Sequence, residues 1–406
     1  MRILLCNNRV QGGSGTDAMV DLEASCLEAS GHEVSRFERR NEELSTGPLT
    51  ARLSTWLQLY WPARAAQRLQ RHAAAFRPDV VHVHNAFPLL TGFVYEVARH
   101  LPRCVTVQSL HNYRAFCPQS YAFRAGHSCE LCRGRAFLPC AVYRCYRNSF
   151  SASAATVALR WAERLRGRPL GFEADLFVAV SRHVAGVHVR LGLPASDVHV
   201  LPNAAQDLAA LAAGEPAAVG RPRRLVYVGA MLDAKGIWRL LPLAAALPEM
   251  EVHAIGAGPE AQSWTAAARA QGLRNVVAHG YQPPPATAAL WRMASLTLVP
   301  SAWDEPFGLS AAESFSLGIP VLTTGAGGLA DIVSHDRDGI VDSFADPGAM
   351  ARNIRALFDD PARYARLCAS ARVRYNEEFS PAAYQARLQD FMEGPVARRL
   401  AERTAA

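Results

Sequence analysis

The chain has 406 residues, half of them hydrophobic, and carries a formal net charge of +7 at neutral pH. This length exceeds the size at which one hydrophobic core keeps growing, so we expect two globular domains and exclude a disordered protein. The sequence holds no apolar run long enough for a signal peptide or a membrane span, which predicts a cytoplasmic protein with nine reduced cysteines. The positive charge suits an anionic partner, and no nucleic-acid motif is present.

The first half of the chain alternates predicted strands with predicted helices. A glycine loop around Gly12 and Gly13 precedes a helix expected over residues 18–29. Such alternation predicts a parallel sheet with helices on both faces, whose ligands gather at the carboxyl ends of the strands. His84 and His111 lie at two of these ends. The strands of this half are expected at residues 1–6, 32–37, 80–84, 104–108 and 176–180.

Residues 49–71 combine aromatic and basic side chains. Trp56, Tyr60 and Trp61 lie there among several arginines, a composition that favours a membrane interface. The alternative is an ordinary amphipathic helix, broken at Pro62, that packs on the protein core. Composition alone leaves both interpretations open.

A second alternation of strands and helices follows a segment rich in Ala, Gly and Pro. The chain is then expected to be largely helical from about residue 346 onward. The strands of this half are expected at residues 225–228, 252–255, 276–279, 296–299 and 321–323. The predicted organisation is a first domain over residues 1–205, a linker over 206–222, a second domain over 223–375 and C-terminal helices over 376–406.

Lys235 is the only lysine among the 43 basic residues of Lys and Arg type. It stands directly before Gly236, in the loop that follows a predicted strand ending at Val228. An ammonium group is a compact, flexible point charge, whereas the planar guanidinium of Arg requires fixed bidentate geometry. The position and type of this residue therefore favour contact with a phosphate.

A second candidate site surrounds two glutamates that are eight residues apart. Glu305 precedes a predicted helix, Gly308 permits close approach of a phosphate to its first turn, and Glu313 lies two turns into it. Glu313 suits the paired hydroxyls of a ribose, and Glu305 suits the hydroxyls of a sugar. The alternative is a pair of solvated helix carboxylates. Strand-end glycine turns at Gly229 and at Gly256 to Gly258 strengthen the nucleotide interpretation.

These motifs together resemble the group 1 glycosyltransferases of family 4, over nearly the whole chain. The resemblance implies a GT-B fold, an α/β architecture of two Rossmann-like domains facing a cleft, with C-terminal helices that cross back to the first domain. The segments that carry it are Gly12-Gly13, Ser30–Val34, Asp79–His84, Val180-Ser181, Leu201–Asn203, Val228-Gly229, Lys235-Gly236, Gly256–Gly258, Glu305–Glu313, Gly318–Pro320 and Gly327-Gly328.

The resemblance also implies roles for individual residues. His111, Glu305 and Lys235 would be catalytic, and the acceptor would meet His84, His111 and Asn112. Ala230 departs from the family pattern, which often has an Arg there; Arg239 or an arginine of the first domain could replace the missing cation. The residues that would bind the donor are Gly12, Gly13, Gly229, Lys235, Gly256, Gly258, Glu305, Phe307, Gly308, Leu309 and Glu313.

A cluster of cysteines follows His111 within residues 112–150. One Cys-x2-Cys pair, Cys129 and Cys132, is accompanied by further thiols and suits either tetrahedral zinc or reduced thiols packed in a loop. The segment resembles an insertion in family members of the bacterial exopolysaccharide and O-antigen type. The zinc ligands that this resemblance implies are Cys117, Cys129, Cys132 and Cys145.

The function that the resemblance implies is retaining transfer of a sugar from a nucleotide diphosphate to a glycan acceptor in polysaccharide biosynthesis. The family needs no metal or other cofactor for this chemistry. We expect a lipid-linked acceptor and a cytoplasmic, peripheral location on the inner face of the membrane. A sugar-nucleotide epimerase and a catalytically silent scaffold subunit are the alternatives, the latter because of Ala230. The nucleotide base, the sugar, the linkage and the oligomeric state do not follow from the sequence.

Overall fold

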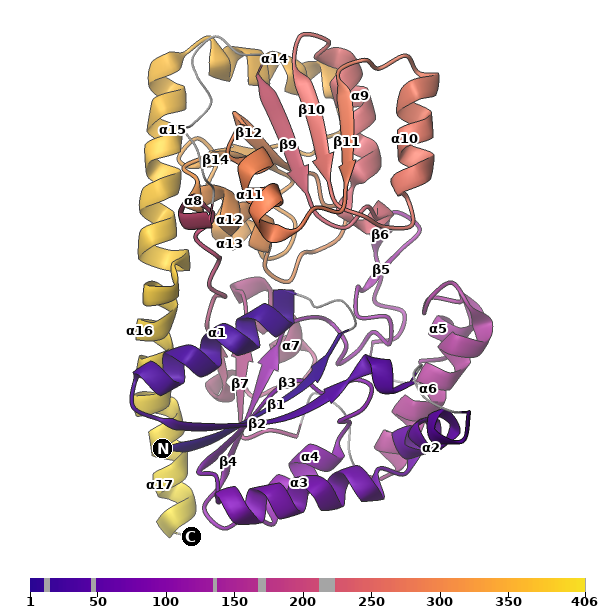
Figure 1. Ribbon diagram of the computed structural model, residues 1–406, viewed down its shortest axis with the longest axis vertical. Coiled ribbons are helices and arrows are strands. Elements are labelled where there is room, and N and C mark those ends of the chain that lie inside the picture. Colours follow the sequence, from indigo (N-terminus) through magenta and orange to yellow (C-terminus); the bar gives the residue numbers. More distant parts are fainter. Residues whose placement is uncertain (11–14, 45–48, 134–136, 167–172, 212–222, 406) are drawn as a thin grey trace. The chain divides into compact units, whose positions relative to one another are not determined.

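The computed structural model describes residues 1–10, 15–44, 49–133, 137–166, 173–211 and 223–405. These residues form two compact units, each built on its own parallel sheet (Figure 1). Unit 1 comprises Met1–Ala122, Cys129–Pro202 and Tyr384–Ala406. Unit 2 comprises Phe123–Ser128 and Asn203–Ala383.

The sheet of unit 1 has six parallel strands in the order β2-β1-β3-β4-β7-β8. All five strands predicted for this half are confirmed. The sixth, β8, was not predicted, because its residues Val-His-Val are only partly buried and form no continuous apolar run. The strands are β1 (Arg2–Arg9), β2 (Glu33–Arg40), β3 (Val80–Asn85), β4 (Val105–Leu110), β7 (Leu176–Ala179) and β8 (Val198–Val200).

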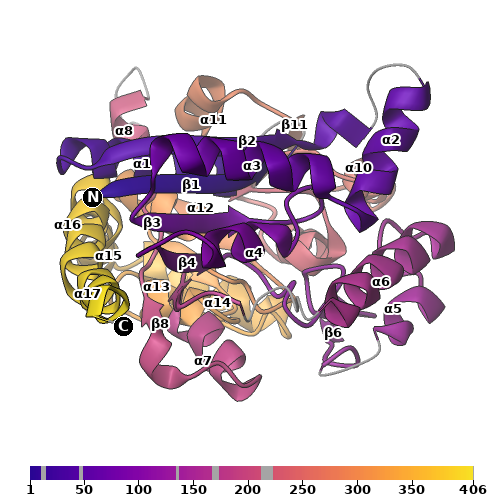
Figure 2. The same cartoon turned by 90° about the horizontal axis from the view of Figure 1, so that it is seen from below.

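Helices cover both faces of this sheet. Side chains of β3 alternate between the faces, so Val81 and Val83 join the hydrophobic core beneath α3 and α4, whereas His82 and His84 point to the side of α1. Figure 2 shows α3 and α4 side by side in front of the strands. The expected break at Pro62 separates α2 from α3. The helices of unit 1 include α1 (Gly15–Ala29), α2 (Leu49–Tyr60), α3 (Ala63–Phe76), α4 (Phe93–Arg99), α5 (Leu138–Val142), α6 (Phe150–Leu165), α7 (Arg182–Arg190) and the 3-10 turns η1 (Asn41–Leu44) and η2 (Ala195–Asp197).

Unit 2 also has six parallel strands, in the order β11-β10-β9-β12-β13-β14, which is the Rossmann order. The five predicted strands are confirmed, and the three-residue β14 was missed. The strands are β9 (Arg224–Val228), β10 (Glu251–Ile255), β11 (Val276–Gly280), β12 (Leu296–Val299), β13 (Val321–Thr323) and β14 (Gly339–Val341), besides the short hairpin of β5 (Phe123–Arg124) and β6 (His127–Ser128).

Short helices connect the strands of unit 2 and pack around a core that includes Trp264, Leu298 and Ile354. The helical elements of this unit are α8 (Leu208–Leu211), η3 (Asp233–Lys235), η4 (Ile237–Arg239), α9 (Leu240–Ala246), α10 (Ala261–Ala270), α11 (Pro284–Trp291), α12 (Leu309–Ser316), α13 (Leu329–Ile332), α14 (Pro347–Phe358), α15 (Pro361–Arg374) and the π-helix η5 (Tyr375–Phe379).

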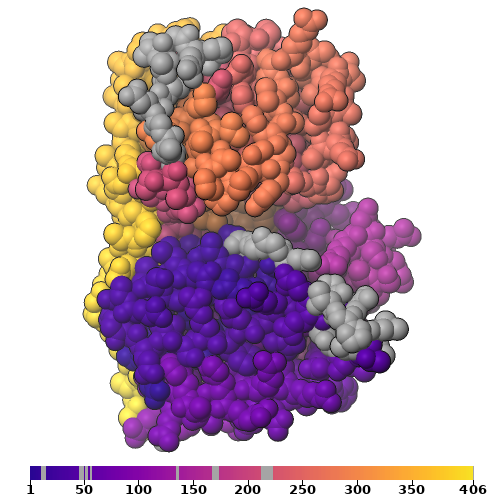
Figure 3. Space-filling model, in the orientation of Figure 1, coloured from indigo at the N-terminus to yellow at the C-terminus, as the bar shows by residue number. Residues whose placement is uncertain are grey.

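The last helices are α16 (Pro381–Phe391), η6 (Met392–Val396) and α17 (Ala397–Ala405), which confirms the helical C-terminal segment. From Tyr384 onward they belong to unit 1, where the segment lies at the surface beside α1 (Figure 3). The Tyr384 hydroxyl donates to Glu23 of α1 over 2.6 Å, and Arg399 pairs with Asp197 at 2.9 Å. These polar contacts attach the C-terminal helices to the rest of unit 1.

Candidate functional site

The loops at the carboxyl edge of the unit 2 sheet pack directly on one another through glycines. A Cβ atom at Gly256 would come within 1.9 Å of the Gly229 carbonyl oxygen, and one at Gly258 within 2.4 Å of the Met231 carbonyl oxygen. Any larger residue would push these loops apart. These glycines therefore hold the strand ends together around the candidate donor site.

Lys235 and Glu305 meet at this edge. The Lys235 ammonium lies 2.7 and 2.9 Å from the two carboxylate oxygens of Glu305, and 5.3 Å from the centre of the Trp303 ring. Glu305 is buried and also accepts a hydrogen bond of 2.6 Å from the Ser301 hydroxyl. The two residues predicted to act on the diphosphate and on the sugar thus form one ion pair.

Glu313 lies on α12, which begins after Gly308 with its φ of 116°. A Cβ atom at Gly308 would lie 2.5 Å from Leu329 Cδ2, so this glycine also serves the packing of α13 beneath the loop. Burial raises the pKa of the Glu313 carboxyl to about 7. Within the part of the chain that the structure describes, this carboxyl group makes no hydrogen bond. A half-buried acceptor of this kind is suited to a ligand with paired hydroxyls.

The neighbours of Glu305 clarify two further predicted positions. Phe307 is buried and contacts the ring of Phe379 at 5.9 Å, so it belongs to the packing beneath the loop. Arg239 donates to the carbonyl oxygens of Pro300 and Ser301, at 3.1 and 3.3 Å, and so holds the loop that leads to Glu305.

The predicted acceptor residues lie together in unit 1. His84 at the end of β3 and His111 just after β4 are joined by a contact of 3.1 Å between His84 Nδ1 and His111 Nε2. Both line a small pocket of about 50 Å³, together with Asn112 and His188. Burial and the neighbouring His84 ring lower the pKa of His111 to about 3, so His111 is neutral at physiological pH.

Sequence reasoning missed Glu23, which lies beneath these histidines. Its carboxylate Oε1 is 2.7 Å from His82 Nδ1 and 3.3 Å from His84 Nε2, and it is almost completely buried. The sequence feature that could have revealed Glu23 is its place as a charged residue on the apolar face of the first helix, beside Met19, Val20 and Leu27. A buried charge at such a place needs partners, and here the partners are histidines.

The predicted glycine loop at Gly12 and Gly13 lies outside the described residues.

The cysteines of the insertion are described, and their thiols influence one another. Burial, followed by the thiols of Cys117, Cys145 and Cys129, raises the pKa of Cys132 to about 11. Cys140 belongs to the same cluster, with a pKa raised to about 12 by burial and by Cys145. Among the described residues, the group whose potential ligand atoms all lie within 4.8 Å of one another is Glu23, His82 and His84 rather than four thiols.

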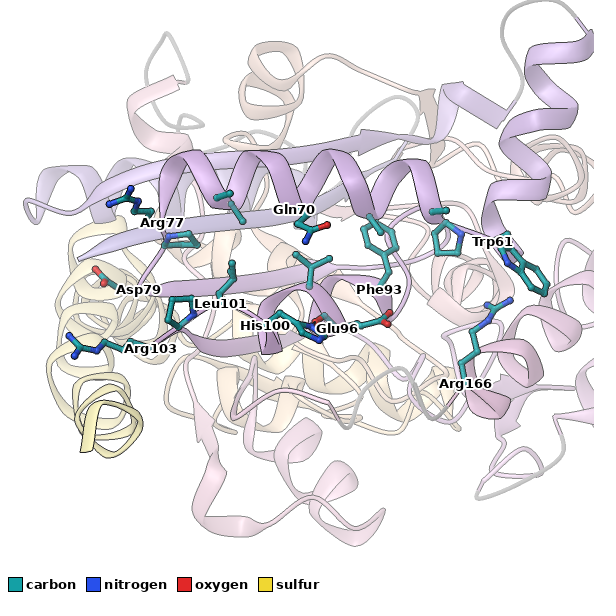
Figure 4. Close-up of a pocket in the computed structure, with 18 residues that line it drawn as sticks. Trp61, Gln70, Arg77, Asp79, Phe93, Glu96, His100, Leu101, Arg103 and Arg166 are labelled. Atoms are coloured by element: carbon teal, nitrogen blue, oxygen red, sulfur yellow. The ribbon is translucent and has the colours of Figure 1, made fainter. Parts of the chain in front are cut away.

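A hollow of about 1010 Å³ lies in unit 1 along α3 and α4 (Figure 4). Trp61 and Arg166 stand at one end, and Arg77, Asp79 and Arg103 at the other. It contains none of the residues predicted for donor or acceptor binding. The residues predicted for donor and acceptor binding lie instead at the strand ends near Lys235 and near His111.

Comparison with protein families matches residues 13–206 to the glycosyltransferase Family 4 model and residues 213–374 to the model of glycosyl transferases group 1. A D-inositol 3-phosphate glycosyltransferase from Catenulispora acidiphila is 30% identical over 302 residues, which cover 72% of this chain and 67% of the relative. Two other curated relatives of that description match over only 25% and 39% of their own length.

Solved structures share the fold. Sucrose-phosphate synthase from Thermosynechococcus elongatus superposes with a TM-score of 0.70 at 18% identity, covering 98% of this chain and all of that one. The Anabaena protein HepE in complex with UDP has a TM-score of 0.67 at 16% identity, over 97% of this chain and all of its own. Two Rossmann-like units and the matches along both of them agree with the predicted GT-B class. The chain belongs to the group 1 glycosyltransferases with a Family 4 N-terminal domain.

Proposed function

We propose that this protein transfers a sugar, with retention of anomeric configuration, from a nucleotide diphosphate to a lipid-linked glycan acceptor in polysaccharide biosynthesis. The observation that carries the proposal is the Lys235–Glu305 ion pair at the strand ends of unit 2, together with the half-buried Glu313 on the helix that follows this loop. Family membership supports an enzyme of glycosyl transfer. The exopolysaccharide or O-antigen setting rests on the resemblance of the cysteine insertion.

The proposed chemistry assigns a task to each of these groups. The bond between the anomeric carbon and the diphosphate oxygen breaks, and negative charge accumulates on the leaving nucleotide. Lys235 and the N-terminal turn of α12 would stabilise that charge, while Glu305 keeps the ammonium in place and accepts hydrogen bonds from the sugar. The acceptor hydroxyl attacks from the face that the diphosphate leaves, and its proton passes to the leaving phosphate.

The test is release of free nucleotide diphosphate from a panel of UDP, GDP, ADP and dTDP sugars, with and without lipid-linked glycan acceptors. UDP-sugars come first, since HepE was solved with UDP. The proposal expects acceptor-dependent release for one donor class and formation of a glycoside. Epimerised donor without acceptor would favour the epimerase alternative, and donor binding without either reaction would favour a scaffold subunit.

Glu313 makes donor binding depend on pH. Its pKa near 7, raised by burial, leaves the carboxyl mostly protonated at pH 6 and mostly ionised at pH 8. Because the ionised form is the better acceptor for ribose hydroxyls, affinity for a nucleotide sugar should rise about 10-fold between these pH values. Calorimetric titration at both pH values measures it. Glu313→Gln should bind the nucleotide sugar weakly and with the same affinity at both pH values. If the affinity of this variant still rises with pH as in the wild type, the assignment is contradicted.

The exposed surface around Trp61 supports the proposed peripheral membrane location. Trp61, Leu57 and Leu165 are 73%, 62% and 80% exposed, and the Arg166 guanidinium lies 4.7 Å from the centre of the Trp61 ring. Large apolar side chains beside arginines suit the boundary between anionic headgroups and acyl chains. No helix among the described residues is long and apolar enough to cross a bilayer.

Vesicle binding tests this surface. Trp61→Ser combined with Leu165→Ser should weaken co-sedimentation with vesicles containing an anionic lipid roughly 10-fold, because two anchors lose their apolar area. Tyr281→Ser is the matched control, since Tyr281 is equally exposed, at 73%, but lies in unit 2. If the double variant and Tyr281→Ser lose vesicle binding equally, or if the double variant loses none, this surface does not bind the membrane.

We also propose a structural zinc ion held by Cys117, Cys129, Cys132 and Cys145. The support is chemical: soft thiols gathered in one small cluster, with a Cys-x2-Cys spacing between two of them. Elemental analysis of the purified protein should find one zinc per chain. Cys132→Ala should lose the ion, whereas Cys140→Ala should retain it; a metal-free wild type or the opposite ranking would refute this ligand set.

A further inference from the structure

A buried chain of polar contacts runs from the C-terminal helix to His111. Tyr384 of α16 donates its hydroxyl hydrogen to Glu23 Oε2 over 2.6 Å. The other oxygen, Glu23 Oε1, lies 3.3 Å from His84 Nε2, and His84 Nδ1 lies 3.1 Å from His111 Nε2. All four residues belong to unit 1.

The protons along this chain can be assigned. Burial opposes ionisation of Glu23, but the facing imidazoles of His82 and His84 outweigh it and hold the pKa of this carboxyl well below its usual range. Burial lowers the pKa of His84 and of His111, so each ring is neutral and carries one N–H hydrogen. An ionised carboxylate only accepts hydrogen bonds, which places the hydrogen of His84 on Nε2 and leaves its Nδ1 as an acceptor.

The second imidazole beside Glu23 obeys the same rule. His82 Nδ1 lies 2.7 Å from Glu23 Oε1, and His82 Nε2 lies 2.9 Å from the Ser109 hydroxyl, which can donate to it. Glu23 thus accepts a hydrogen bond from Tyr384 at Oε2, and its Oε1 faces the imidazole nitrogens of His82 and His84 at 2.7 and 3.3 Å. The electrostatic attraction of these facing N–H groups explains how a carboxylate remains ionised at a buried position.

We infer that Glu23 and His84 are positioning residues that hold His111 as its Nε2–H tautomer, so that Nδ1 of His111 accepts a hydrogen bond from a substrate hydroxyl. The inference rests on the proposed function in one respect, namely that the hydroxyl belongs to a sugar. Since His84 Nδ1 is an acceptor, His111 must donate from Nε2, and the remaining nitrogen is unprotonated. Tyr384 fixes the carboxylate, so the C-terminal helix takes part in the arrangement.

The pocket beside His111 agrees with a ligand that donates. His188 is completely buried, its Nδ1 lies 2.8 Å from the Val184 carbonyl oxygen, and its Nε2 is therefore an acceptor. This Nε2 atom and Gln108 Oε1 have no hydrogen-bond partner among the described residues, and both side chains line the pocket. Three acceptors around about 50 Å³ suit a hydroxyl group.

Direct contact describes this cluster better than a shared metal ion. Two ligand atoms bound to one tetrahedral ion at about 2.1 Å each lie about 3.4 Å apart. Glu23 Oε1 and His82 Nδ1 are separated by 2.7 Å, which is a hydrogen-bond distance. The carboxylate and the imidazole therefore contact each other.

The experiment reads the tautomer directly. Long-range hydrogen–nitrogen correlation spectra of protein labelled with ¹⁵N-histidine identify the protonated nitrogen of each ring, and His111→Asn assigns the signal. We expect protonated Nε2 and bare Nδ1 for His111 in the wild type. Glu23→Gln should shift His111 toward the other tautomer and lower kcat about 10- to 100-fold, with KM for the donor within about 2-fold.

Glu28→Gln is the control, because Glu28 is an exposed glutamate on the same helix. It should match the wild type in both readouts. Three results would each overturn the inference. The first is a wild-type His111 that is protonated at Nδ1, and the second is a Glu23→Gln spectrum identical to that of Glu28→Gln. The third is a metal that is bound to the wild type and absent from Glu23→Gln. If Glu23→Gln does not fold, the wild-type spectrum still decides. If no variant transfers sugar, the proposed function fails while the spectra continue to decide the tautomer.

Discussion

Lys235→Ala is expected to reduce sugar transfer by about 100-fold or more, the largest effect of any single substitution in unit 2. The ammonium is the group that we propose stabilises the diphosphate, and Ala230 stands where the family resemblance leads us to expect an arginine. Removing it takes away stabilisation of the departing diphosphate and also leaves the buried Glu305 without its ion-pair partner. That unpaired carboxylate should cost about 1–3 kcal/mol of stability. Kinetics and denaturant unfolding measure the two losses.

Two controls separate charge from folding. Lys235→Arg restores a cation and should recover stability better than activity, since a guanidinium does not reproduce the point charge. An amine-directed reagent offers a test without mutation: Lys235 is the only lysine, so side-chain acylation occurs at one site. A nucleotide sugar should protect against the resulting inactivation. Full activity of the acylated protein or of Lys235→Ala would refute the assigned role.

His111→Ala is expected to lower kcat by on the order of 100-fold while donor affinity stays within about 2-fold of the wild type. His111 lies in unit 1, whereas Lys235 and Glu313, which are assigned to the donor nucleotide, lie in unit 2. Loss of this side chain should thus impair the reacting complex more than nucleotide binding. Rapid-mixing or steady-state kinetics together with donor titration measure the two quantities.

His100→Ala provides the comparison for His111→Ala. His100 is an exposed histidine at the end of α4 and is not among the residues that line the His111 pocket. Its removal should leave both quantities unchanged. A decrease in donor affinity that accounts for the whole loss in His111→Ala would show that His111 acts on nucleotide binding instead.

The sheets followed from the sequence because parallel strands buried on both faces are continuous apolar runs, such as Leu225–Val228. The three-residue strands β8 and β14 lack such a run, so pairing with a neighbour, rather than local pattern, forms them. Motif order placed Lys235 and Glu305 in one site. Their direct ion pair could not be predicted, since it depends on two loops that are 70 residues apart in the chain.

The glycine turns and the histidines were also predicted by position, but their contacts were not. The glycine turns were predicted, but the role of Gly256 in accommodating the Gly229 carbonyl depends on how two strand ends are packed together. His84 and His111 were predicted for the acceptor from their positions at strand ends. Glu23 was missed because its partners lie about 60 residues away in the chain and on different elements. Local patterns predict elements and strand ends, whereas contacts between elements require the fold.

The most direct test of the central claim, that unit 2 binds a nucleotide sugar through Lys235 and Glu313, is a thermal-shift screen against UDP, GDP, ADP and dTDP sugars. The wild type is compared with Lys235→Ala and Glu313→Ala. We predict a higher melting temperature with one nucleotide class, and no such increase in either variant. Stabilisation that persists in both variants, or no stabilisation of the wild type by any of these donors, would contradict the assigned donor site.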